Sequence, residues 1–197
     1  MKLKSLVAGA VLSLCTFTVF AADPKKPDMD PDMMDAMMKA GTPGDAHKAL
    51  NPFVGKWDTK VTFWMMPGSD PMVTTGMSEN KWVMGGRYLE QHFSGTMMGA
   101  PFEGMGVTGY DNVKKQYWGT WMDSMSTGMM ISTGSASADG KTFTYTATMA
   151  DPMTGKDASS DEKITIVDAN HHTMEMWGPG PDGKNYKMME IHYTRSK

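Results

Sequence analysis

The chain has 197 residues, of which 40% are hydrophobic and 21% are charged, enough for one domain with a packed core and too apolar for a disordered chain. Its formal net charge of -3 gives no sign of the basic surface that a nucleic-acid-binding protein needs. Methionine is unusually frequent, with 24 residues, whereas cysteine occurs once.

The first 21 residues have the pattern of a secretory signal peptide. Lys2 and Lys4 precede an apolar run, and Val19 and Ala21 provide small residues at the -3 and -1 positions of a cleavage site. We therefore predict an exported protein, periplasmic or secreted, without a membrane span after cleavage; an uncleaved anchor is the alternative. Cleavage would also remove Cys15 and leave a chain without disulfide or thiol chemistry.

Residues 22–49 are predicted to form a flexible tail and a short helix rich in methionine. Asp30 is a suitable helix cap, Pro31 suits the first helical position, and Gly41 and Pro43 would end the helix near residue 40. Such a short helix is marginal in water by itself, so it must dock on another part of the molecule or form only transiently.

Residues 50–197 show the alternation of antiparallel strands. Phe143, Tyr145, Ala147 and Met149 alternate with threonines, which places one face of the strand in the core and the other in water. Turn signals recur at short intervals, and we count about ten strands between residues 54 and 195. Because sheets of that size tend to curl shut, we predict an all-β fold, an antiparallel barrel of about ten strands with a short N-terminal helix. A β-sandwich is the alternative.

Several short motifs follow one another in an order that resembles a known family. They are Pro43-Gly44 with His47-Lys48, Phe53-Val54-Gly55-Lys56-Trp57, Gly85-Gly86-Arg87-Tyr88, Pro101-Phe102-Glu103-Gly104, Gly109-Tyr110-Asp111-Asn112 and Met189-Glu190-Ile191-His192-Tyr193-Thr194-Arg195. Over residues 30–196 the chain resembles the domain-of-unknown-function family 1579 (DUF1579). The resemblance implies a lipocalin-like, calycin-type barrel and, by the name of the family, no assigned activity.

The broader resemblance to lipocalin-like barrels implies a structural role for Gly55, Trp57 and Arg195. In such barrels a tryptophan at this place closes the base, and an arginine of the last strand lies across its indole. An Arg–Trp contact shielded from water contributes about 2 kcal/mol, so it would hold the first and last strands together. Further lipocalin motifs are missing, and the carrier function transfers only by analogy.

The aromatic residues are the strongest indication of a binding pocket. We expect a small apolar ligand inside the barrel beside Trp121, Tyr145 and Met176, with Arg87 or Tyr110 as the polar contact. The alternative is a barrel filled completely by its own side chains.

The methionines suggest a second hypothesis, a site for Cu(I) or Ag(I). Met33, Met34, Met37 and Met38 share a face of the predicted helix, and His47 follows as a further ligand. Thioether sulfur selects Cu(I) among biological metals. Methionines that only pack, for instance over the barrel mouth, and methionines that act as a reversible sink for oxidants are the alternatives.

The other histidines give weaker signals. His171 and His172 fall in a predicted hairpin turn, where we expect solvated side chains. Haem-binding barrels of the nitrobindin type hold iron through a histidine late in the chain, which invites a comparison with His192. If Arg195 points inward, strand alternation turns His192 outward, so we expect no haem unless a bulge reverses the alternation. Apart from Cu(I), no cofactor is expected.

Catalytic motifs are missing from the sequence. It contains no metalloprotease helix motif, no nucleophile elbow and no phosphate-binding glycine loop, so we expect a binding protein rather than an enzyme. A pair of carboxylates that meet in the barrel mouth is the catalytic alternative. The candidates for it are Glu79, Glu90, Glu103, Glu175 and Glu190.

Overall fold

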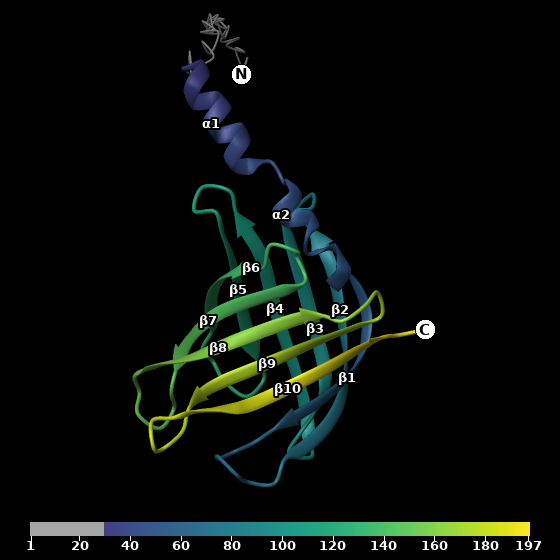
Figure 1. The fold of residues 1–197 in the computed structure, drawn as a ribbon, viewed down its shortest axis with the longest axis vertical. Helices are drawn as coiled ribbons and strands as arrows, with labels where there is room; N and C mark the ends of the chain where they lie inside the picture. Colours follow the sequence, from purple (N-terminus) through teal and green to yellow (C-terminus); the bar gives the residue numbers. More distant parts are fainter. Residues whose placement is uncertain (1–29) are drawn as a thin grey trace, which may run out of the picture.

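A computed structural model describes residues 30–197; the predicted signal peptide (1–21) and the first part of the predicted tail (22–29) lie outside the described residues. Ten antiparallel strands form a closed barrel, in which each strand pairs with its neighbours in sequence and the last strand pairs with the first (Figure 1). The strands are β1 (Gly55–Phe63), β2 (Met72–Val83), β3 (Tyr88–Met97), β4 (Ala100–Asp111), β5 (Gln116–Asp123), β6 (Met130–Ala136), β7 (Thr142–Ala150), β8 (Asp157–Ile166), β9 (His171–Pro179) and β10 (Asn185–Arg195). The predicted fold class is confirmed.

The strand pairing follows the alternation of the sequence. On β7, Phe143, Tyr145 and Ala147 are buried, while the threonines between them face outward. Tight turns keep consecutive strands in register. Between β3 and β4, for example, Met98 and Gly99 both have positive φ, 50° and 81°, as a two-residue hairpin turn requires.

Three short helical segments precede the barrel: α1 (Pro31–Gly41), α2 (Asp45–Lys48) and the 3-10 turn η1 (Asn51–Phe53). Asp30 caps α1 by accepting a hydrogen bond from the backbone N of Asp32 at 2.9 Å. α1 extends away from the barrel and has no buried residue (Figure 1). None of the helices within residues 30–197 has the length and apolarity needed to cross a membrane.

The turn between β4 and β5 attaches α1 to the barrel. The side-chain nitrogen of Asn112 donates to the carbonyl oxygens of Lys39, Ala40 and Thr42, at 3.2, 3.2 and 2.8 Å. The C-terminal end of α1 is thus held by hydrogen bonds to otherwise free carbonyls rather than by buried apolar surface.

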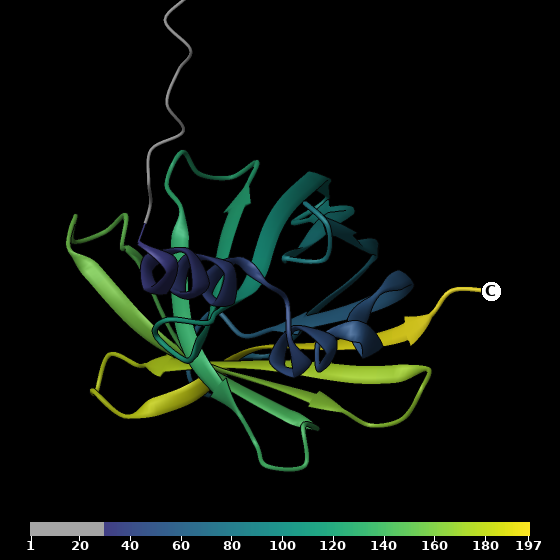
Figure 2. The same cartoon turned by 90° about the horizontal axis from the view of Figure 1, so that it is seen from above.

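The two ends of the barrel differ. At the end where β1 begins and β10 ends, called the closed end, α2 and η1 lie across the barrel (Figure 2). Leu50 and Phe53 of this segment pack there in one core cluster with Leu89, Tyr117 and Phe143. The opposite end, called the open end, consists of the loops 64–71, 98–99, 124–129, 151–156 and 180–184.

Candidate functional site

The barrel encloses a cavity of about 370 Å³. Leu50 and Phe53 form its floor at the closed end, and Met125, Ser126 and Gly128 of the loop 124–129 line its mouth at the open end. This volume lies within the usual range of sites for small molecules. The cavity is therefore the candidate site.

Methionine side chains make up a large part of the cavity wall. The seven that line it are Met97, Met125, Met130, Met149, Met174, Met176 and Met189. Met176 on β9 and Met189 on β10 are direct cross-strand partners, and Met174 points inward two residues before Met176. Thioether side chains are flexible and polarisable, so this wall can adapt to ligands of different shape.

Trp121 supplies an aromatic wall because glycines on the neighbouring strand leave room for its indole. A Cβ atom on Gly104 would lie 2.2 Å from Trp121 Cζ2, and one on Gly106 would lie 3.2 Å from Trp121 Cε3. The indole Nε1 donates to Asp123 Oδ2 at 3.0 Å. The ring is thereby held flat against β4 and faces the cavity with its apolar surface.

Polar side chains on β2 and β3 bond to one another and to the backbone. Gln91 Nε2 donates to Ser78 Oγ at 2.9 Å, and Ser78 Oγ donates to Asn80 Oδ1 at 3.0 Å. Asn80 Nδ2 in turn donates to the carbonyl oxygen of Phe53 at 2.9 Å. This chain of hydrogen bonds ties η1 to the sheet, so its members serve the structure of the closed end.

Glu162 on β8 is one of two polar residues lining the cavity, with His172, that have a buried side-chain atom without a hydrogen-bond partner among residues 30–197. Its residue surface is only 7% exposed, and it lies between Tyr145 on β7 and Met176 on β9 in the strand register. Its Oε1 atom has no hydrogen-bond partner among residues 30–197. Burial raises the pKa of the carboxyl group to about 7, so both the neutral and the charged forms are present at neutral pH.

His172 lies inside the barrel, and the prediction of a solvated turn residue is wrong for it. Because β9 begins at His171, strand alternation turns His171 outward and His172 inward. The His172 ring stacks on Tyr193, with centroids 4.1 Å apart, and contacts Trp57 edge-on at 4.3 Å. Burial, helped by the positive charge of Arg195, lowers the pKa of His172 to about 3, so the ring is neutral.

The predicted contact between Trp57 and Arg195 is present at the closed end. Arg195 Cζ lies 4.1 Å from the centroid of the Trp57 ring, and the two residues are partners in the β1–β10 register. Gly55 leaves room for this contact, since its φ is +123° and a Cβ atom there would lie 2.6 Å from Arg195 Nη1. A larger residue at position 55 would displace the guanidinium.

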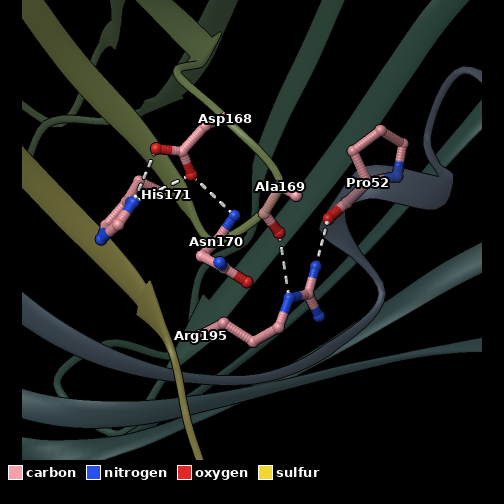
Figure 3. Close-up of polar contacts among 6 residues, drawn as sticks. All are labelled: Pro52, Asp168, Ala169, Asn170, His171 and Arg195. Carbon is pink, nitrogen blue, oxygen red and sulfur yellow. Dashed lines mark hydrogen bonds and ion pairs between the residues drawn. The ribbon is translucent and has the colours of Figure 1, made fainter.

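The Arg195 guanidinium also connects three backbone segments. Its Nε donates to the carbonyl oxygen of Ala169 at 3.1 Å and its Nη2 to that of Pro52 at 3.1 Å (Figure 3). Its Nη1 donates to the carbonyl oxygen of Val54 at 2.8 Å. The last strand is thus joined to η1, to the start of β1 and to the β8–β9 turn.

Of the predicted ligand contacts, the structure brings Trp121, Tyr145 and Met176 together around the cavity. Arg87 and Tyr110 lie elsewhere. Arg87 is exposed in the β2–β3 turn and donates to the carbonyl oxygen of Met84, and Tyr110 packs against His47 and Tyr117. The physical reason is that α2 and η1 cover the end of the barrel where these two residues lie.

Of the predicted metal ligands, Met33, Met34, Met37 and Met38 are exposed on α1, between 46% and 67%. His47 is apart from them: it is buried in α2, where its Nδ1 accepts a hydrogen bond from the Gly44 backbone at 3.1 Å. Burial also lowers the pKa of His47. Within residues 30–197, no three or more His, Cys, Asp or Glu side chains gather in a way that would hold a metal ion.

The five predicted glutamates do not line the cavity. Glu175 and Glu190 both contact Lys187, Glu90 contacts Lys81 at 3.2 Å, and Glu79 lies 4.0 Å from Lys56. The exposed His192 also contacts Glu190, and the alternation does place its side chain on the outside of β10. The acidic residues of the cavity are Glu162 and Asp123, which the sequence analysis did not single out.

Comparisons with known proteins agree with this architecture. Residues 42–195 match the family described as "Protein of unknown function (DUF1579)". No curated protein matches the chain in sequence. The structure is similar to the crystal structure of Rv2717c from M. tuberculosis, with a TM-score of 0.61 and 15% identity over 79% of this chain and 100% of that one. A redesigned β-barrel, 15% identical over 76% of this chain and 96% of its own, has a TM-score of 0.41, too low to support an inference.

Proposed function

The chain belongs to the DUF1579 family, and from that premise we propose that it is a lipocalin-like binding protein that holds a small apolar molecule inside its barrel. The single observation that carries the proposal is the cavity of about 370 Å³, whose walls are mostly apolar and include aromatic rings and seven methionine side chains. Its floor is closed by Leu50 and Phe53, and its mouth lies among the open-end loops. We propose a binding role rather than catalysis.

The physical basis of binding is the burial of apolar surface. Transfer of apolar surface from water into a dry cavity is favourable by about 25 cal/mol for each Å². The barrel is closed by hydrogen bonds around its whole circumference, so the site is formed before the ligand arrives. The residues of the wall then contribute as a surface, with Trp121 and Tyr145 as the large flat contacts.

The test uses a neutral apolar dye, N-phenylnaphthylamine, whose fluorescence rises when it leaves water. Ser132 on β6 is buried and lines the cavity, whereas the adjacent Thr133 is exposed on the outer face of the same strand. We expect Ser132→Phe to lower dye affinity by about tenfold or more by filling the cavity. Thr133→Phe, which adds a similar ring outside the barrel, is expected to leave the affinity unchanged.

Two results would contradict the proposal. One is a wild-type protein that gives no saturable fluorescence increase with the dye. The other is an equal loss of affinity in Ser132→Phe and Thr133→Phe while both variants keep the circular dichroism spectrum of the barrel, because the dye would then bind outside the cavity.

We also propose that the protein acts outside the cytoplasm, after cleavage behind Ala21. The support is the sequence pattern of residues 1–21. Cell fractionation followed by N-terminal sequencing of the accumulated protein tests this. We expect a mature chain that begins at Ala22 in the exported fraction, and a full-length chain in the cytoplasm would contradict the proposal.

A second candidate function is the binding of Cu(I) by the methionines of α1. The observation that favours it is the exposure of Met33, Met34, Met37 and Met38 on a helix that buries no residue, because packing within the described chain does not explain these four side chains. Side chains three and four positions apart share a helix face, so two or three sulfurs can reach one ion.

Titration of Cu(I) against a competing chelator tests this candidate. Replacement of the four α1 methionines by leucine keeps the apolar face and removes the sulfurs, and we expect the Cu(I) affinity to fall by about tenfold or more. Met65→Leu with Met66→Leu, two exposed methionines of the loop 64–71, is the matched control. Equal affinity of the wild-type protein and the α1 variant would rule out a site on α1.

A further inference from the structure

The carboxyl group of Glu162 has no role in holding the barrel together. Although the residue is only 7% exposed, its Oε1 has no hydrogen-bond partner among residues 30–197. A buried polar atom without a partner lowers the stability of the fold, and a charged one lowers it more. The polar side chains Ser78, Asn80 and Gln91 of β2 and β3 are, by contrast, joined to one another. The Glu162 carboxyl is therefore free for a ligand.

The charges around the cavity determine which ligands fit. Among the described residues that line it, the acidic side chains are Glu162 and Asp123, and neither lysine nor arginine occurs. Asp123 is already occupied, because its oxygens accept hydrogen bonds from Trp121 Nε1 and from the backbone N of Met125. An anionic ligand such as a fatty acid would meet negative charge and no compensating cation inside the barrel.

We propose that the ligand is a small apolar amine, whose ammonium group pairs with the carboxylate of Glu162 while its apolar part fills the methionine-lined cavity. This inference rests on the proposed function of the barrel as a binding site for a small molecule. The ammonium group would supply the hydrogen-bond donor that Glu162 Oε1 lacks, and the carboxylate would supply the counter-charge that an amine needs when it leaves water.

The rest of the cavity also suits a cation with an apolar body. Trp121 and Tyr145 line it with aromatic rings, and ring faces attract an ammonium group. The sulfur atoms of Met176 and its partner Met189 add a polarisable wall on the side of β9 and β10. In the strand register Glu162 lies directly between Tyr145 and Met176, so the carboxyl group, an aromatic ring and a thioether are immediate neighbours.

Binding of an amine should depend on pH through Glu162. Burial raises the pKa of its carboxyl group to about 7, so the carboxylate needed for the pair forms as the pH rises through that value. Three titratable groups that line the cavity with it do not titrate near neutrality. Burial raises the pKa of Tyr145 on β7 and that of Tyr193 on β10, the latter to about 12, and lowers that of His172 on β9 to about 3. Asp123 of β5 also faces the cavity.

The experiment compares three probes of nearly equal shape and different charge: phenylbutylamine, phenylbutanol and phenylbutanoate. Each is titrated at pH 8 as a competitor of N-phenylnaphthylamine, with the full mature chain. We expect the amine to bind about tenfold or more tightly than the alcohol, and the carboxylate to bind most weakly. Glu162→Gln should remove the preference for the amine and change the affinity for the alcohol by less than about threefold.

Glu103→Gln is the matched control, because Glu103 is exposed on the outer face of β4 and its replacement makes the same change in net charge. This variant should keep the preference for the amine. The wild-type protein provides an independent measurement: between pH 6 and pH 8 the affinity for the amine should rise several-fold, while the affinity for the alcohol stays constant. This pH dependence of the wild-type protein still tests the inference if Glu162→Gln fails to fold.

The outcomes separate the two proposals. Three results would overturn the amine inference and leave the binding function standing. In the first, the dye and the alcohol bind but the amine binds no more tightly than the alcohol. In the others, Glu162→Gln keeps the preference for the amine, or Glu103→Gln loses it to the same extent as Glu162→Gln. If phenylbutanoate binds best, the inference is likewise overturned. If neither the dye nor any probe binds the wild-type protein, the proposed function fails and the inference falls with it.

Discussion

The closed and open ends of this barrel are formed by the same ten strands, yet their inward-facing side chains differ in kind. At the closed end aromatic and aliphatic side chains meet the segment α2–η1 and leave little space, as Leu50 at 1% and Phe143 at 0% exposure show. Toward the open end methionine side chains form a large part of the wall, and the wall surrounds the cavity. Packing at the closed end thus stabilises the barrel, and the cavity toward the open end leaves room for a ligand.

A network of hydrogen bonds links the closed end to the sheet. Near the closed end Trp57 Nε1 and Asn80 Nδ2 both donate to the carbonyl oxygen of Phe53, and Arg195 reaches three further carbonyls. Away from that network Glu162 has a carboxyl oxygen without a partner among residues 30–197. The other buried side-chain atoms without a partner in the described residues are Thr59 Oγ1 and His172 Nδ1, and both side chains are uncharged. Glu162 differs from them because its carboxyl group can become charged and pair with a cation.

The largest expected effect comes from shortening a side chain of the closed end. Phe143→Ala removes a ring that packs against Phe53 and Tyr117, with centroids 5.4 and 5.2 Å away. We expect the free energy of unfolding to fall by about 3–5 kcal/mol. Met149→Ala, on the same strand at the open end, should cost less than about 1 kcal/mol because the side chain already borders a void. Urea denaturation measures both, and equal losses would remove the distinction between the ends.

Arg195→Ala is expected to destabilise the barrel by about 2–3 kcal/mol, since it removes the contact with Trp57 and three hydrogen bonds. The control is Arg87→Ala, because Arg87 is exposed and makes one hydrogen bond to Met84. Its effect should stay below about 0.5 kcal/mol. Thermal unfolding compares the two variants, and a similar loss in both would show that Arg195 has no special role in closure.

Glu162→Gln should change how stability depends on pH. The folded state favours the neutral carboxyl group of Glu162, because burial raises its pKa from 4.5 to about 7. The contribution of this group to the free energy of unfolding is therefore fully present below pH 4.5 and is lost as the pH rises through 7. Glutamine stays neutral, and the variant should therefore gain stability over the wild-type protein between pH 5 and pH 8, by at most about 3 kcal/mol. Urea denaturation at pH 5 and pH 8 measures the difference in free energy of unfolding between the variant and the wild-type protein. The same difference at both pH values would contradict burial of the carboxyl group.

The smallest expected effect concerns α1, which lies outside both ends. Asn112→Ala removes the three hydrogen bonds that hold the C-terminal end of this helix. Because α1 buries no residue, the free energy of unfolding of the barrel should change by less than about 0.5 kcal/mol. Hydrogen exchange of residues 31–42 should nevertheless become faster. Unchanged exchange there would show that something else holds the helix.

Much of this architecture could be predicted from the sequence, because apolar residues at the inward-facing positions of most strands alternate with polar residues at the outward-facing positions. The alternation around Phe143 predicts β7, and Asp30 and Gly41 predict the ends of α1. Three of the five predicted ligand contacts, Trp121, Tyr145 and Met176, also line the cavity. They could be identified because burial favours the inward face of a barrel strand for a large apolar side chain.

The polar part of the site could not be predicted in the same way. Residues 157–163 on β8 are almost entirely polar, so no apolar alternation indicates that Glu162 faces inward. His172 was missed because the turn signal Asp168-Ala169-Asn170 does not show where the turn ends and β9 begins. Arg87 and Tyr110 lie away from the cavity because of how deeply α2 and η1 enter the barrel, which local patterns do not determine.

The most direct test of a ligand site in the open half of the barrel uses the methionines themselves as reporters. In a sample labelled with ¹³C at the methionine methyl groups, each thioether methyl gives its own NMR signal. On saturation with phenylbutylamine, we expect large shifts for Met174, Met176 and Met189, which line the cavity, and none for Met33 and Met37 on the exposed helix. Shifts confined to the helix methionines, with the cavity signals unmoved, would contradict a ligand site in the open half of the barrel.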